Sequence, residues 1–83
     1  MQFTFAESAK GDVGKLPKKI QRGIREKLLY WQSSTNPLDH AKSLTQHTEA
    51  THRFRFSAYR ILVKQVGSEL RILRIRHRKD VYR

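Results

Sequence analysis

The chain of 83 residues has 18 Lys and Arg against 7 Asp and Glu, a formal net charge of +11, and no cysteine. This length suits a single thin core, so we expect residues 1–83 to form one domain. Without cysteine there are no disulfides and no thiolate metal sites, which agrees with a reducing cytoplasm. Apolar residues make up 37% of the chain and form no run near the roughly 20 residues that a transmembrane helix needs. The first residues lack the basic-then-apolar order of a signal peptide, so we expect a cytoplasmic protein.

The positive charge is distributed unevenly along the chain. Residues 1–51 hold 8 basic and 5 acidic side chains, a net +3, whereas residues 52–83 hold 10 basic and 2 acidic, a net +8. Self-repulsion on this scale opposes compact folding and indicates a polyanionic partner, either nucleic acid or an acidic protein. The alternative is a basic surface without a specific partner.

The N-terminal half predicts a strand followed by a helical hairpin. Residues 2–5 alternate polar and apolar side chains, which is typical of a short strand. Residues 6–15 have helical composition weakened by two glycines. Residues 17–32 form the strongest pattern, because apolar side chains recur there at the spacing of an amphipathic helix: Ile20, Ile24, Leu28 and Trp31. Turn residues follow at 33–37, and we expect a further helical turn within 38–44.

The C-terminal half predicts three strands after a polar loop at 45–51. They span residues 52–56, 59–66 and 70–75, joined by turns at Ser57-Ala58 and Gly67-Ser68. The element order is therefore β-α-α-β-β-β. It predicts an α+β fold in which a small antiparallel sheet packs against the N-terminal helical hairpin.

Arginines on the predicted strands form the candidate binding site. Strict alternation in residues 52–56 puts Phe54 and Phe56 on one face and Arg53 and Arg55 on the other. The two arginines then lie about 7 Å apart, close to the separation of successive phosphates in a nucleic-acid strand. Other candidates in a meander sheet are Arg60, Arg74, Arg76, Arg78, Lys79 and Tyr82. Guanidinium groups bind phosphate bidentately, although basic strands are also common as solvated outer faces.

Other site chemistries find little support. His40, His47 and His52 are spaced too widely for a typical zinc ligand pair. The sequence contains no phosphate-binding glycine loop, and its carboxylates are too scattered for two-metal nuclease chemistry. We therefore expect no cofactor, and any phosphodiester cleavage is expected to be independent of metal.

The order of these residues resembles the RelE/ParE toxin superfamily across nearly the whole chain. The matching segments are Lys15-Leu16-Pro17, Ile20-Gln21, Ile24, Asn36-Pro37, His52-Arg53-Phe54-Arg55, Tyr59-Arg60-Ile61-Leu62 and the ending Ile75-Arg76-His77-Arg78-Lys79-Asp80-Val81-Tyr82-Arg83. The resemblance implies the toxin of a type II toxin–antitoxin system, which an acidic antitoxin neutralises in a complex that can assemble further.

Two activities occur within this superfamily. RelE-type members are ribosome-dependent endoribonucleases that cut mRNA in the ribosomal A site. In their reaction the 2′-hydroxyl attacks the adjacent phosphate without a metal, and cationic residues stabilise the charge that develops. ParE-like members inhibit DNA gyrase and cut no RNA, which is the alternative function. An inert nucleic-acid-binding module is a third possibility.

The resemblance also implies roles for individual residues. By position, the paired strand lysines of the family fall on Arg53 and Arg55, and the strand arginine falls on Arg60. The late arginine falls on Arg78 or Arg76, and the terminal tyrosine on Tyr82. Further RNA contacts are expected from Arg74, Arg76 and Lys79.

Arginine stands where RelE-type toxins have lysines, and this changes the predicted chemistry. An arginine is effectively never deprotonated, so Arg53 and Arg55 can hold a phosphate but cannot accept a proton. We expect His77 to act in proton transfer, since the ordinary pKa of histidine is about 6.5. The alternative is that His77 only packs at the end of its strand. Glu49 or Asp80 can supply a base only if the fold brings it to the arginines.

Overall fold

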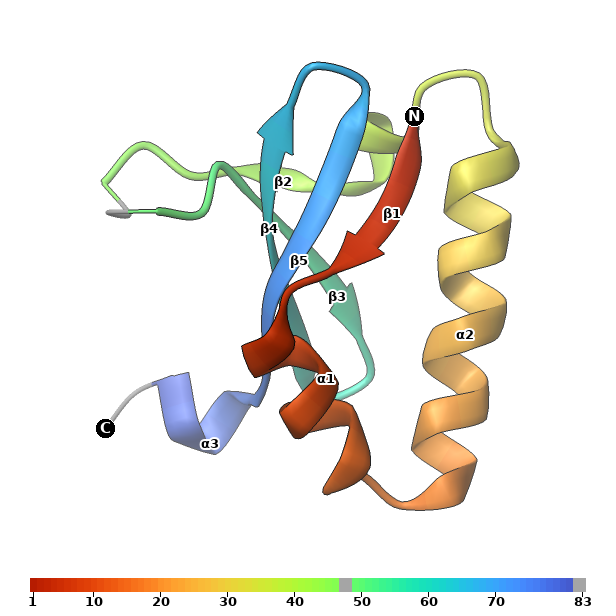
Figure 1. The fold of residues 1–83 in the computed structure, drawn as a ribbon, viewed down its shortest axis with the longest axis vertical. Helices are drawn as coiled ribbons and strands as arrows, with labels where there is room; N and C mark the ends of the chain where they lie inside the picture. Colours follow the sequence, from red (N-terminus) through yellow and green to blue (C-terminus); the bar gives the residue numbers. More distant parts are fainter. Residues whose placement is uncertain (47–48, 82–83) are drawn as a thin grey trace.

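The computed structural model describes residues 1–46 and 49–81, with only the backbone at Asp80 and Val81. Its elements (Figure 1) are β1 (Gln2–Phe5), α1 (Glu7–Gly14), α2 (Lys18–Ser33), the 3-10 turn η1 (Pro37–His40), β2 (Lys42–Ser43), β3 (His52–Phe56), β4 (Tyr59–Val66), β5 (Glu69–His77) and α3 (Arg78–Val81). The α+β class, the helical pair and the three C-terminal strands are confirmed. The short strand β2 and the short helix α3 were not predicted.

The five strands form one sheet in the order β1-β5-β4-β3-β2. Strands β3, β4 and β5 make the predicted antiparallel meander. Strand β1, however, runs parallel to β5, with Phe3 opposite Leu70, so the sheet is mixed rather than wholly antiparallel. The sequence pattern could not reveal this direction, because a strand has the same alternation of apolar side chains whichever way its neighbour runs.

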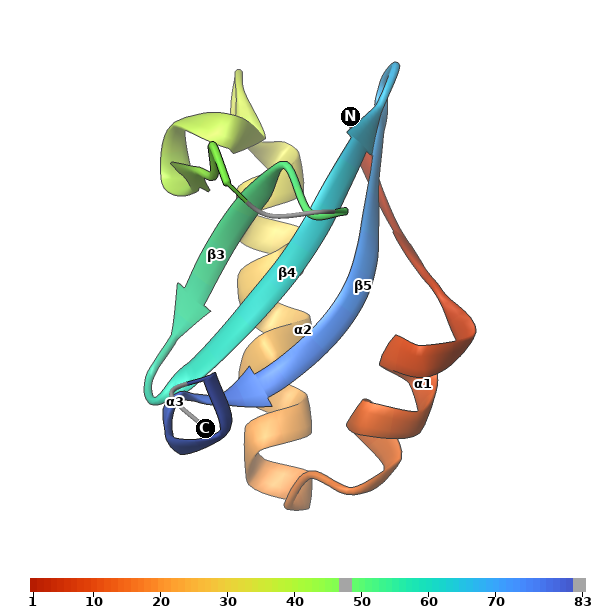
Figure 2. The same cartoon turned by 90° about the vertical axis from the view of Figure 1, so that its left-hand side faces the viewer.

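Helix α2 covers one face of the sheet and builds most of the core against it, and α1 adds the fully buried Ala9. The buried α2 residues Ile24, Leu28 and Trp31 pack towards the strands, and the ring of Trp31 lies 4.7 Å from that of Phe54 between centroids. Seen from the other side, β3, β4 and β5 cross in front of α2 (Figure 2). In the part of the chain that the structure describes, no helix is both long and apolar enough to span a membrane.

Strand β5 contains a bulge that was not predicted. Leu62 pairs with Arg74 and Val63 with Ile72, so Leu73 is an extra residue on β5. In a regular strand, residues three apart point to opposite faces; the bulge lets both Ile72 and Ile75 lie in the core, 0% and 4% exposed. Two consequences follow: the apolar residues stay buried, and Arg76 projects from the face opposite α2.

Helix α1 lies along the edge of β5, where it satisfies the backbone groups of the bulge. The carbonyls of the consecutive residues Ile72 and Leu73 both accept hydrogen bonds from this side, from the Ala6 N–H at 2.9 Å and the Ser8 hydroxyl at 2.7 Å. The Ile75 N–H donates to the Asp12 carboxylate at 2.9 Å. Ser8 and Asp12 are four residues apart, so one face of α1 supplies both side chains.

Gly23 allows α2 to approach β3 closely. A Cβ atom at this position would lie 2.4 Å from Cζ of Phe56, so the ring would have to move. We therefore expect Gly23→Ala to lower the free energy of unfolding by about 1–3 kcal/mol, measured by urea denaturation. Gly11→Ala is the control, since a Cβ there meets nothing within 4 Å and alanine favours a helix interior by up to about 1 kcal/mol. Equal unfolding midpoints for the two variants would contradict this packing.

Candidate nucleic-acid interface

Three arginines form a row across the face of the sheet that α2 leaves uncovered. Arg55 on β3 pairs with Arg60 on β4, and Arg60 pairs with Arg76 on β5. Residues directly opposite in antiparallel strands project from the same face. Since neighbouring strands lie about 4.8 Å apart, the backbone positions of this arginine row (Arg55, Arg60 and Arg76) span about 10 Å.

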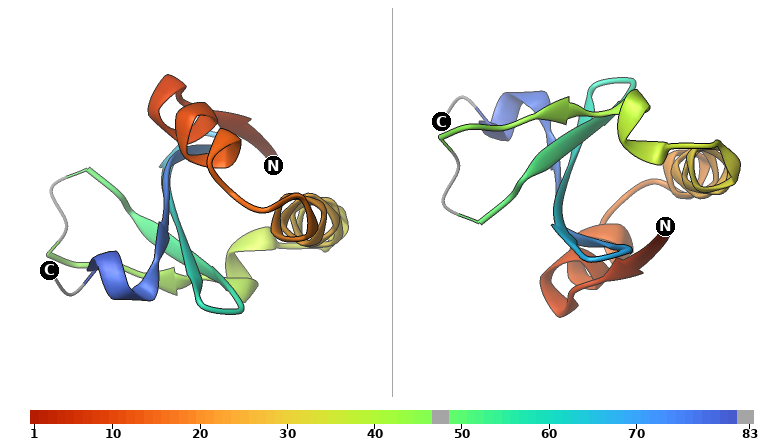
Figure 3. Two further views of the ribbon diagram at one scale, coloured as in Figure 1. Left: turned by 90° about the horizontal axis from the view of Figure 1, so that it is seen from below. Right: turned by 90° about the horizontal axis from the view of Figure 1, so that it is seen from above.

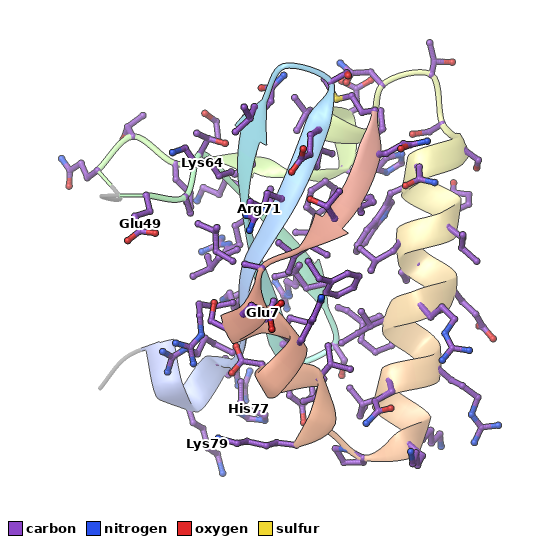
Figure 4. The ribbon with its side chains drawn as sticks, in the orientation of Figure 1. Glu7, Glu49, Lys64, Arg71, His77 and Lys79 are labelled. Carbon is purple, nitrogen blue, oxygen red and sulfur yellow. The ribbon has the colours of Figure 1, made fainter. Side chains whose placement is uncertain are left out.

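Further cations surround the arginine row on the same face. Arg53 lies two residues before Arg55 and pairs with Lys42 on β2 and with Leu62 on β4. Farther along the sheet, Lys64 pairs with Arg71 (Figure 4). The strand pattern thus brings Arg53, Arg55, Arg60 and Arg76 together as predicted, and it adds Lys42 and Lys64.

Among the residues whose side chains the structure describes, the arginine row has no ionic partner. Within residues 1–46 and 49–79, the salt bridges join Lys10 to Glu7, Arg71 to Glu69 and Arg74 to Asp12. Nε of Arg60 is buried without a hydrogen-bond partner, which costs roughly 1–3 kcal/mol for a polar group. Like charges placed directly opposite each other in a sheet also destabilise it. An anion that binds the row offsets the repulsion between the arginines.

Arg74, by contrast, is held by Asp12. Its Nε and one terminal nitrogen donate to the two carboxylate oxygens at 2.9 and 3.0 Å, and the Asp12 side chain is only 12% exposed. Burial by itself raises the pKa of Asp12. The hydrogen bonds from Arg74 and the Ile75 N–H, with the charges of Arg74 and Arg76, outweigh burial and lower the pKa below its ordinary 3.8. The predicted RNA contact Arg74 is therefore engaged within the fold.

His77 lies on the other face of the sheet from the arginine row. It pairs with Tyr59, their ring centroids are 5.1 Å apart, and it follows buried Ile75 by two residues. Its Nδ1 accepts a hydrogen bond from the Lys79 N–H at 3.2 Å, which leaves Nε2 as the protonated nitrogen of the neutral ring. His77 thus supports the start of α3, and its role in proton transfer stays a prediction.

The remaining site candidates follow β5 or lie in the loop before β3. Arg78 and Lys79 are exposed on α3, which lies on the opposite side of the sheet from α2 (Figure 3), and the Arg78 N–H donates to the Ala58 carbonyl at 2.7 Å. Glu49 lies in the loop between β2 and β3, on the same side as Lys64 (Figure 4). Tyr82 and the side chain of Asp80 lie outside the described residues.

Sequence reasoning missed Ser8 and Asp12, which hold the end of β5. No sequence signal marks them, because a serine and an aspartate on a short helix are typical of any exposed helical face. Only their contacts with residues more than 60 positions away, at Leu73, Arg74 and Ile75, distinguish them.

A separate apolar groove of about 440 Å³ lies between α2, α1 and the free edge of β1. Phe3, Phe5, Ile24 and Leu28 are among its lining residues, and Arg25 is the only cation there. This lining does not suit a polyanion, so the face of the sheet that carries the arginine row remains the candidate interface.

Comparisons with known proteins agree with this arrangement. No protein-family model matches the sequence. Toxin RelG of Mycobacterium tuberculosis is 32% identical over 81 residues, which cover 95% of this chain and 92% of the relative. The chain belongs to the RelE-type toxin family. This confirms the resemblance on which the site residues were assigned.

Two solved structures of the family share the fold. The crystal structure of the toxin–antitoxin complex RelBE2 from Mycobacterium tuberculosis contains a chain with a TM-score of 0.77 and 28% identity, covering 92% of this chain and 95% of that one. The RelB-RelE antitoxin–toxin complex from Methanococcus jannaschii has a TM-score of 0.74 and 26% identity, covering 94% and 93% respectively. The sheet that displays the arginine row is thus a property of RelE-type toxins.

The lowered pKa of Asp12 predicts how stability depends on pH. Because this pKa is lower in the folded chain than in the unfolded one, the contribution of Asp12 to stability is complete well above the ordinary value of 3.8. It is lost as the pH falls through the folded value. Asp12→Ala should therefore lower stability at pH 7, by about 1–3 kcal/mol per hydrogen bond lost, and flatten the acid limb of a stability–pH profile below about pH 4.

Glu7→Ala is the matched control, because it removes the same charge from α1. The Glu7 side chain is 91% exposed and pairs only with Lys10 among the described residues. If the stability of the two variants changes in the same way below about pH 4, the Asp12 contacts do not stabilise the fold.

Proposed function

We propose that this protein is the endoribonuclease toxin of a type II toxin–antitoxin pair and that the arginine row binds the scissile phosphate. The observation that supports this most strongly is the row itself, three guanidinium groups from three strands with no carboxylate partner among the described residues. A stable fold gains nothing from such a row in isolation. A phosphodiester supplies the negative charge that the row lacks.

The proposed reaction is metal-independent transesterification. The 2′-oxygen attacks the adjacent phosphorus while its proton passes to a base, and the bond from phosphorus to the 5′-oxygen breaks. The 5′-oxygen takes up a proton from an acid or from water, so the products are a 2′,3′-cyclic phosphate and a 5′-hydroxyl. Arg55, Arg60 and Arg76 stabilise the charge on the phosphoryl oxygens in the transition state. Arg53 and the exposed cations of α3 then hold the flanking nucleotides.

The permanent charge of arginine favours electrostatic stabilisation over proton transfer by these residues. Nδ1 of His77 accepts the Lys79 N–H, so Nε2 carries the proton of the neutral ring. In this arrangement His77 can donate a proton through Nε2, and it can accept one only if the bond to Lys79 breaks. The substrate is proposed to be mRNA in the ribosomal A site, where the ribosome fixes the chain beside the arginine row. Holding the reacting groups in a fixed geometry can itself account for much of the rate acceleration.

The proposed partner before activation is an acidic antitoxin. Two structural neighbours were solved as toxin–antitoxin complexes, and the net charge of +11 complements an acidic chain. We also place the protein in the cytoplasm, where ribosomes are found.

The test of this function is mRNA cleavage in a translation reaction, with new 5′ ends mapped by primer extension. We expect Arg60→Gln to reduce the cleavage rate by about 10²–10³, the usual cost of one lost transition-state donor. The same variant should keep or raise stability, because it removes the repulsion and the buried unpartnered nitrogen. Arg22→Gln, an equal loss of charge on the exposed face of α2, should leave most of the cleavage intact.

Two outcomes would overturn the proposal. Uncut mRNA with wild-type protein, together with gyrase-dependent DNA damage, would assign the chain to the alternative, ParE-like activity. Equal loss of cleavage in Arg60→Gln and Arg22→Gln would mean that total charge, and not the arginine row, determines activity.

His77→Gln separates the two roles open to this residue. Glutamine can still accept the Lys79 N–H but does not titrate near neutral pH. If His77 transfers a proton, the variant loses cleavage by about 10²–10⁴ and the acid-side pH dependence disappears. If His77 only supports α3, His77→Gln cleaves nearly as well as wild type and His77→Ala does not.

A further inference from the structure

The position of Arg76 depends on the bulge in β5. Ile72 and Ile75 are both buried, although residues three apart in a regular strand face opposite ways. If the bulge at Leu73 were absent while Ile72 stayed in the core, Ile75 would project outward and Arg76 would turn towards α2. The arginine row would then lose its member on β5, because a shift of one residue exchanges the two faces of a strand.

Pairs with β4 flank the bulge on both sides, but Leu73 itself has no partner residue on β4. The pairing is interrupted between Leu62 and Val63. The last backbone bond between the β1 side and β5 runs from the Ala6 N–H to the Ile72 carbonyl. Beyond that point the hydrogen bonds on this edge come from two side chains of α1. Ser8 donates to the Leu73 carbonyl at 2.7 Å, and Asp12 accepts from the Ile75 N–H at 2.9 Å.

Asp12 also fixes the residue between these two backbone contacts. Its carboxylate binds Arg74 through two nitrogens, so the side chain of Arg74 cannot join the arginine row while this pair is intact. The segment from Leu73 to Ile75 is therefore tied to α1 at three successive residues. Arg76 follows directly, and its charge is among those that act on Asp12.

We propose that Asp12, assisted by Ser8, is a positioning residue that holds the β5 bulge and so keeps Arg76 in the arginine row. This inference rests on the proposed function only in taking the arginine row as the site that binds RNA phosphate. Asp12 itself touches no substrate. Its carboxylate sets the register of β5 through the Ile75 N–H and Arg74.

Two measurements on purified protein test this. The first is the register of β5, read from cross-strand NOEs between Arg60 and Arg76 in Asp12→Ala, with Glu7→Ala as the control. We expect these NOEs to be lost or weakened in Asp12→Ala and kept in Glu7→Ala. Should Asp12→Ala fail to fold, Ser8→Ala removes only the bond to the Leu73 carbonyl and should give a weaker change in the same direction.

The second measurement is the affinity for a single-stranded RNA oligonucleotide with 2′-O-methyl groups, which cannot be cleaved, by fluorescence anisotropy. Both alanine variants remove one negative charge, so long-range electrostatics alone would tighten RNA binding in both. We expect Glu7→Ala to bind as tightly as wild type or more tightly, and Asp12→Ala to bind about tenfold more weakly, as for the loss of one charged phosphate contact. In an Arg76→Gln background, Asp12→Ala should weaken binding no further.

The inference is overturned if the NOEs between Arg60 and Arg76 persist in Asp12→Ala. It is also overturned if Asp12→Ala binds RNA as tightly as Glu7→Ala does. A third contrary result is that Asp12→Ala weakens RNA binding by the same factor in the wild-type and the Arg76→Gln backgrounds. Failure of the proposed function looks different. If the register shifts in Asp12→Ala but Arg76→Gln binds RNA like wild type, Asp12 positions Arg76 as inferred and the arginine row is not the RNA site.

Discussion

The contact between Asp12 and the bulge of β5 is the constraint on which the functional face depends. One carboxylate accepts from the Ile75 N–H and from two nitrogens of Arg74, and it joins α1 to a strand more than 60 residues later. Burial of a charge is costly, and here it is offset by three donors and two guanidinium charges. Because the bulge changes which face each later residue takes, this local contact decides how Ile75 and Arg76 divide between core and surface.

The two faces of the sheet affect the stability of the fold in opposite ways. Towards α2, buried side chains such as Phe54 and Ile61 pack without a polar group among the buried residues that the structure describes. On the other face, arginines oppose each other across strands, and no described carboxylate forms a salt bridge with Arg55, Arg60 or Arg76. The first arrangement stabilises the fold and the second opposes it. The stability of the core thus compensates for the repulsion within the arginine row.

Membership of the RelE-type family explains the fold, but it leaves the chemistry to the residues on the arginine face. Arginines at positions 53 and 55 carry guanidinium groups, which suit the phosphate binding that we propose and cannot take up a proton. His77 lies on the face opposite the arginine row, where its Nδ1 supports the start of α3. Under the proposed function, catalysis by charge stabilisation suits such a surface better than catalysis by a general base within the sheet.

The sequence by itself determined the element types, the amphipathic helix at α2 and the placement of Arg53 and Arg55 on one face, because helical and strand periodicities are local properties of the chain. It also identified the family. The parallel direction of β1, the division between Ile75 and Arg76, the engagement of Arg74 by Asp12 and the placement of His77 were decided only by the tertiary structure. Each of these depends on a pairing partner far away in the chain. A bulge shifts the face of every residue after it. No periodicity within the strand reveals where a helix such as α1 will supply hydrogen-bond partners for the backbone of the bulge.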